Sequence, residues 1–165
     1  MFILSGCGEN TAVSLSTMLP KEAWPEVATW QSEGTFFLDL PAHPLHEFDG
    51  VNEETVSDTF QLVGLNDTAV VMNYAYRFID KAAARSVWEA LQSRLQADDG
   101  PARILVPQED DVFAYGFTGE TALFVGGGLR DDVLILLVLE TSEEAAVSGE
   151  ELFMKGWREI NRREG

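Results

Sequence analysis

The sequence has one cysteine, two histidines and only 11 basic residues, and each shortage narrows what the protein can be. A single cysteine excludes an intrachain disulfide, so a packed core must hold the fold, in an oxidising or a reducing compartment alike. The 28 acidic residues outnumber the basic ones and give a formal net charge of −17. Such a surface repels phosphates and anionic headgroups, so nucleic acid is not expected as a partner. It favours cationic partners or divalent ions, and a halophilic origin would also explain it.

Long apolar runs are lacking too. The longest run after residue 7 covers 133–139 and ends at Glu140, whereas a helix that spans a bilayer needs about 20 apolar residues. The chain has 165 residues, of which 45% are hydrophobic. This length and composition predict one globular domain with a sizeable core.

The N-terminal tetrapeptide Leu4-Ser5-Gly6-Cys7 resembles the bacterial lipobox, where lipoprotein signal peptides are cut and the new N-terminal cysteine is lipidated. The resemblance implies a lipid on Cys7, attachment to the membrane through that lipid, and an extracytoplasmic location in the cell envelope. It also divides the chain into a signal-peptide remnant (1–7), a tether with a short helical segment (8–34) and a globular domain (35–165).

The start of the chain departs from a complete lipoprotein signal. Only six residues precede Cys7 and none is Lys or Arg, whereas such signals begin with a charged region and a longer apolar stretch. A start codon assigned too late, or a sequence trimmed at the box, would account for the difference. The alternative is a cytoplasmic protein whose first strand ends in Ser-Gly-Cys.

The first half of the domain is predicted to be mostly strand. Residues 35–40 look like a strand that ends at Pro41, and 59–65 and 69–78 like a hairpin around Asn66-Asp67. The second hairpin strand alternates in hydrophobicity, which predicts a half-buried strand with Asn73 and Arg77 on the open face. Apolar residues in 52–63 also have helical spacing, so a helix over 52–63 is an alternative to the first hairpin strand. Trp24, Val27 and Trp30 favour one short helix before the domain.

The second half contains the clearest helices. Asp80 is a good N-cap, and an apolar stripe follows it at Ala84, Val87, Trp88, Leu91 and Leu95. Strands are expected at 103–106, 112–117, 121–125 and 133–139, and the last is apolar on both faces, as in a central strand. Ser148 and Glu151 form a capping box for a terminal helix with the stripe Leu152, Phe153, Gly156, Trp157 and Ile160.

These elements predict an α+β fold, with an antiparallel sheet of about five to six strands and at least two packed helices. Their order from Tyr74 to Glu140 is similar to that of small actinobacterial lipoproteins and of the extracellular sensor domains of receptor kinases. The resemblance implies an extracytoplasmic domain that binds a ligand or partner and has no catalysis of its own. The chain lacks the paired cysteines that such domains commonly carry.

Three segments contain residues of the types found in metal-binding or phosphate-binding sites. His43 and His46, with Glu47 and Asp49 nearby, offer imidazole and carboxylate ligands for a transition metal, as a weak candidate site in a proline-containing loop. The acidic run 109–111 does not have EF-hand spacing and favours a turn. Gly126-Gly127-Gly128 is not followed by the lysine of a phosphate loop, so it is interpreted as a bulge or flexible turn.

No catalytic residue, bound metal or cofactor is predicted. Trp24, Trp30, Tyr74 and Tyr76 are candidates for a partner or ligand surface, with the alternative that the helix over 80–97 covers the two tyrosines. The favoured hypothesis is a lipid-anchored extracytoplasmic binding or accessory domain without catalysis. The alternatives are a cytosolic acidic domain for protein–protein interaction and a metal-dependent enzyme that uses His43 and His46.

Overall fold

The structure is a computed structural model. It describes residues 14–19, 21, 24, 48, 51–52, 54–65, 69–97, 111–117, 121–142 and 148–162 (for residue 161 the backbone alone), and the backbone of 29–33 and 102–103. The elements in chain order are η1 (Leu15–Met18), β1 (Thr29–Glu33), β2 (Val56–Leu65), β3 (Ala69–Phe78), α1 (Lys81–Ala97), β4 (Ala102–Arg103), β5 (Val112–Phe117), β6 (Thr121–Arg130), β7 (Val133–Ser142) and α2 (Gly149–Arg162).

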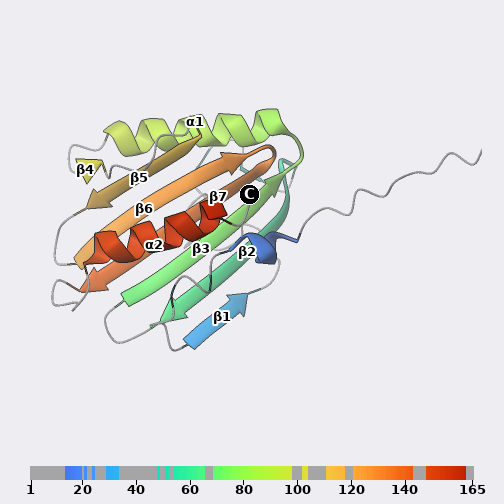
Figure 1. Cartoon of the computed structure of the whole chain (residues 1–165). Coiled ribbons are helices and arrows are strands. Elements are labelled where there is room, and N and C mark those ends of the chain that lie inside the picture. Colours follow the sequence, from blue (N-terminus) through green and yellow to red (C-terminus); the bar gives the residue numbers. More distant parts are fainter. Residues whose placement is uncertain are drawn as a thin grey trace, which may run out of the picture.

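The strands form one antiparallel sheet in the order β1-β2-β3-β7-β6-β5-β4 (Figure 1). The predicted α+β class is confirmed. The sheet of the described residues has seven strands, slightly more than expected, because β1 and β4 add short edge strands. β7 lies in the middle, as its apolar character on both faces predicted, and its residues from Val133 to Leu139 are all buried. The hairpin prediction is confirmed by β2 and β3, which excludes the helix considered for 52–63.

The two helices cover opposite faces of this sheet. Ala84, Val87, Trp88 and Leu91 of α1 pack with one set of strand side chains. Phe153, Trp157 and Ile160 of α2 pack with the alternate set, together with Leu15 and Leu19 of η1 and its flank. We call these the α1 face and the α2 face, and Figure 1 shows α2 and η1 lying over the same side of the strands.

Asp80 caps the N-terminus of α1, as the sequence predicted. The side-chain oxygen Oδ1 of Asp80 accepts a hydrogen bond of 2.8 Å from the backbone N–H of Ala83. Lys81 and Arg85 in the first turns form ion pairs with Asp131 and Asp111. These contacts connect the exposed side of α1 to the β6–β7 turn and to the residue before β5. The hydrogen bonds raise the pKa of both cationic side chains.

β3 is buried on both faces, so the expectation of a half-buried strand was wrong. Asn73 is fully buried, at 0% exposure, although the sequence placed it on an open face. Its neighbours across the sheet are Leu62 on β2 and Leu137 on β7, and both belong to the core of the α2 face. The physical reason is the second helical layer, which covers the side of the sheet that alternation had assigned to solvent.

The glycine run 126–128 lies inside β6, so its interpretation as a bulge or turn was wrong. The three glycines pair in register with both β5 and β7. A Cβ added at Gly126 would meet the ring of Phe153 at 2.2 Å, and one at Gly128 would meet Trp157 at 3.3 Å. The glycines let two aromatic rings of α2 approach the sheet backbone closely.

The described parts of residues 8–34 pack with the domain. Leu15, Leu19 and Trp24 are buried in the core of the α2 face, and β1 pairs with β2 along the sheet edge. Trp30 therefore lies in a strand, so the expectation of a helix that includes Trp30 was wrong. Pro25 disfavours a continuous helix, while Thr29 and Trp30 have side chains that suit a strand. The predicted strand at 35–40 lies outside the described residues.

Candidate binding surface on the outer face of α2

The predicted site residues fall into two groups. Cys7, His43 and His46 lie outside the described residues. Within the part of the chain that the structure describes, no three His, Cys, Asp or Glu side chains are grouped so that they could hold a metal ion.

The aromatic candidates for a partner surface are largely core residues. Trp24 is 1%, Tyr74 4% and Tyr76 0% exposed, which excludes these three as a preformed ligand or partner surface. Tyr74 and Tyr76 lie in the same cluster as Trp88 of α1, so the alternative that the helix covers the tyrosines is correct. For Trp30 the structure describes the backbone only, in β1.

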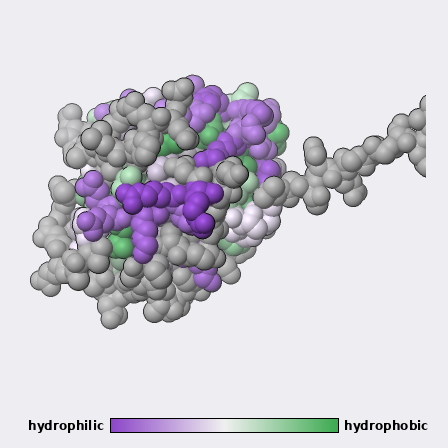
Figure 2. Space-filling model, in the orientation of Figure 1, coloured by the Kyte–Doolittle hydropathy of each residue, from purple (hydrophilic) through white to green (hydrophobic). Residues whose placement is uncertain are grey.

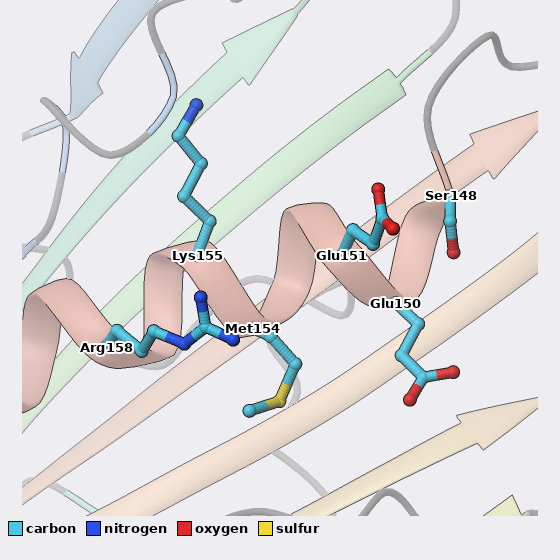
Figure 3. A pocket seen from close by; sticks show the side chains of 6 residues that line it. All are labelled: Ser148, Glu150, Glu151, Met154, Lys155 and Arg158. Atoms are coloured by element: carbon cyan, nitrogen blue, oxygen red, sulfur yellow. The ribbon is translucent and has the colours of Figure 1, made fainter.

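A hollow of about 660 Å³ lies against the outward side of α2 (Figure 3). Its described lining consists of residues that the sequence analysis had not proposed as a site: Ser148, Glu150, Glu151, Met154, Lys155 and Arg158. Figure 2 shows strongly hydrophilic side chains gathered along this helix. The described part of this surface is therefore mostly polar, and its residues belong to α2 except for Ser148, which directly precedes the helix.

Helical geometry explains why these side chains point outward. Phe153, Trp157 and Ile160 are buried on the sheet, at spacings of three and four residues. Side chains on the opposite side of the helix then face away from the sheet: Glu150, Glu151 and Arg158 are exposed, while Met154 and Lys155 are half-buried. The apolar stripe that anchors α2 thus also decides which polar residues border the hollow.

Charge is separated along the hollow. Glu150 and Glu151 occupy the first turn of α2, where the positive end of the helix dipole stabilises carboxylates. Lys155 and Arg158 follow one and two turns later, with Met154 between the two groups (Figure 3). The surface therefore presents anionic and cationic groups at opposite ends.

Arg158 differs from the other arginine near it. Arg162 forms two hydrogen bonds with the carboxylate of Glu159, at 2.9 and 2.7 Å, and this interaction raises the pKa of Arg162. Arg158 forms no ion pair with any side chain in the described part of the protein. Its guanidinium extends along the helix toward Met154 in Figure 3, so it can contact a molecule that enters the hollow.

A sequence signal for this surface existed. Glu151, Lys155 and Arg158 follow one another at helical spacing, beside the apolar stripe of the predicted terminal helix. The hollow itself could not be predicted, because its shape depends on how α2 is seated on the sheet.

Comparison with known proteins identifies the fold. The structure is similar to the extracellular domain of PknH from Mycobacterium tuberculosis, with a TM-score of 0.59 and 11% sequence identity, over 90% of this chain and 95% of that one. No protein family matches the chain. No curated protein matches it either.

The shared fold agrees with the sequence-based resemblance to extracellular domains. At 11% identity the similarity concerns the arrangement of helices and strands, and it covers nearly the whole of both chains. Among the described residues, neither helix has the length and apolar character required to cross a bilayer.

Proposed function

We propose that the protein is a lipid-anchored, extracytoplasmic domain that binds a ligand or a partner protein and has no catalysis of its own. The observation that carries the proposal is the fold shared with the extracellular domain of PknH across 90% of this chain. The lipobox Leu4-Ser5-Gly6-Cys7 supports the location independently, since it is a pattern of the sequence.

The lipid supplies the membrane affinity in this proposal. Each buried methylene of an acyl chain contributes about 0.8 kcal/mol, and two or more chains anchor a protein stably. A net charge of −17 would keep the domain itself away from anionic headgroups. The acyl groups on Cys7 would therefore attach the protein to the membrane, while the acidic domain would be repelled from the membrane surface.

The outer face of α2 is the part of the described surface best suited to binding. It combines a hollow with exposed groups of both charges, whereas Trp24, Tyr74 and Tyr76 are buried in the core. A ligand there would contact α2 without disturbing the packing of the sheet.

The anchoring is tested by the intact mass of the protein purified from native membranes, expressed from its gene together with the DNA upstream of Met1. We expect residues 1–6 to be absent and Cys7 to carry two or three acyl chains. Cys7→Ser is the matched variant, and it should leave the membrane fraction and retain its N-terminal residues.

A free Cys7 thiol with residues 1–6 retained would overturn the anchored-domain proposal. That result would favour the cytosolic alternative, an acidic domain for protein–protein interaction.

A further inference from the structure

We infer that the hollow on the outer face of α2 recognises a short peptide with free ends. The peptide lies along the helix with its ammonium group at Glu150 and Glu151 and its carboxylate at Arg158. The inference rests on the proposed function only in taking this face of α2 as the binding surface. It adds the chemical class of the ligand.

The separation of the charges selects the length of the ligand. Glu150 and Arg158 are eight positions apart, which corresponds to about 12 Å along an α-helix. An extended peptide advances about 3.3 Å per residue. A chain of three to four residues, about 10–13 Å long, therefore has the length to place its two terminal charges near the two ends of the hollow.

The carboxylate end is matched by Arg158. A guanidinium presents paired donors that fit a carboxylate in a bidentate arrangement. Because Arg158 is exposed and forms no ion pair with a described residue, no existing ion pair with those residues has to break when the ligand binds. Arg162, held by Glu159, lacks this freedom.

The ammonium end is matched by Glu150 and Glu151. These carboxylates are exposed at the first turn of α2, and the overall charge of −17 adds to the attraction for a cation. The same overall charge disfavours polyanions, so a ligand with one carboxylate and one ammonium suits the site better than a phosphate-rich ligand.

The middle of the hollow is suited to variable side chains. Met154 is half-buried there, and its unbranched thioether adapts to groups of different shape. Recognition then depends on the two ends of the peptide more than on its side chains. We therefore expect tripeptides of different sequence to bind with similar affinity, and peptides with an acetylated N-terminus or an amidated C-terminus to bind more weakly.

The test is calorimetric titration of the full chain with trialanine, trialanine amide and N-acetyl-trialanine. We expect trialanine to bind, and each blocked peptide to bind about tenfold to a hundredfold more weakly, as for the loss of one charge-assisted contact. Arg158→Gln should weaken trialanine binding by a similar factor and should not affect the amide. Arg162→Gln removes the same charge from the same helix outside the hollow and is the matched control.

The opposite end is tested by the double variant Glu150→Gln/Glu151→Gln, which should bind trialanine and N-acetyl-trialanine equally. Glu89→Gln on α1 is its surface control, since Glu89 is also exposed but lies outside the hollow. Superimposable circular dichroism spectra of all variants establish that the fold is retained.

Equal affinity for trialanine and its amide would overturn the inference, and so would equal losses in Arg158→Gln and Arg162→Gln or the absence of trialanine binding. A lipidated protein that binds no peptide would contradict this inference and leave the anchored-domain proposal standing. A free Cys7 thiol in a protein that still binds trialanine more tightly than the two blocked peptides would contradict the anchored-domain proposal and leave the peptide inference standing.

Discussion

Trp24 packs directly against Gly156 in the middle of α2, so closely that a Cβ at Gly156 would lie 2.1 Å from Cζ2 of the indole. This contact joins a residue near the start of the chain to the last helix. Gly in a helix interior normally costs about 1 kcal/mol relative to Ala. Here the missing side chain is what allows the indole to lie against the helix.

Gly156→Ala is therefore expected to lower the free energy of unfolding, by about 1–3 kcal/mol, because the added methyl overlaps a buried ring. Urea unfolding followed by far-UV circular dichroism measures the change. In the Trp24→Ala background the same substitution should be neutral or stabilising. A stabilisation of about 1 kcal/mol in the otherwise unchanged protein, as helix propensity alone would give, would contradict the role of this contact.

Asn73 is expected to weaken the core. Its carboxamide is fully buried, and neither Oδ1 nor Nδ2 has a hydrogen-bond partner among the described residues, a condition that costs about 1–3 kcal/mol. Asn73→Val should therefore raise the free energy of unfolding, since Leu62 and Leu137 flank the position and a β-branched residue suits a strand. The midpoint of urea unfolding measures it.

Asn73→Asp is the contrasting variant at this site. A carboxylate of nearly the same shape would be buried with its charge, so this protein should be clearly less stable than the original at neutral pH. Loss of stability in both the Val and the Asp variant would show that the amide at 73 is needed in the native state.

Tyr76 is expected to make the free energy of unfolding depend on pH in the alkaline range. Burial, and secondarily the neighbouring Tyr74, raises the pKa of the Tyr76 phenol well above its ordinary value of 10.0. The unfolded chain thus loses this proton at a lower pH than the folded protein does. The contribution of Tyr76 is fully present below about pH 10 and decreases as the pH rises above it.

The urea midpoint should accordingly fall above about pH 10, and fall less steeply in Tyr76→Phe. Part of the decline should remain in the variant, because the hydrogen bond with Asp131 raises the pKa of Lys81 and acts in the same direction. Identical pH profiles for the two proteins would argue against a buried, neutral phenol.

The N-cap of α1 should contribute measurably to stability. Asp80→Ala removes the acceptor for the backbone N–H of Ala83 and is expected to cost about 1 kcal/mol. Asp80→Asn retains a capping oxygen and should lose much less. Thermal unfolding followed by circular dichroism compares the three proteins, and equal losses in both variants would show that the cap is not the cause.

Local patterns predicted much of this fold. The cap at Asp80 and the stripe through Trp88 defined α1, and an apolar run on both faces placed β7 at the centre of the sheet. These features depend on residues that are close in sequence, and the period of the side chains alone is enough to reveal them.

The failures have a common cause, which is the layer of α2 and η1 over the second face of the sheet. Asn73 was placed toward solvent and Gly126–Gly128 in a turn, because neither local pattern reveals a partner contributed by distant residues such as Phe153. The hollow of the candidate binding surface could not be predicted for the same reason, since its shape depends on how α2 packs on the sheet.

By itself, the sequence determined the composition, the acidic charge, the lipobox-like start and the positions of most helices and strands. Only the tertiary structure decided that Trp24, Tyr74 and Tyr76 are core residues and that Arg158 borders a hollow. The physical reason is that periodicity and capping act within a few residues, whereas burial depends on which elements meet in three dimensions.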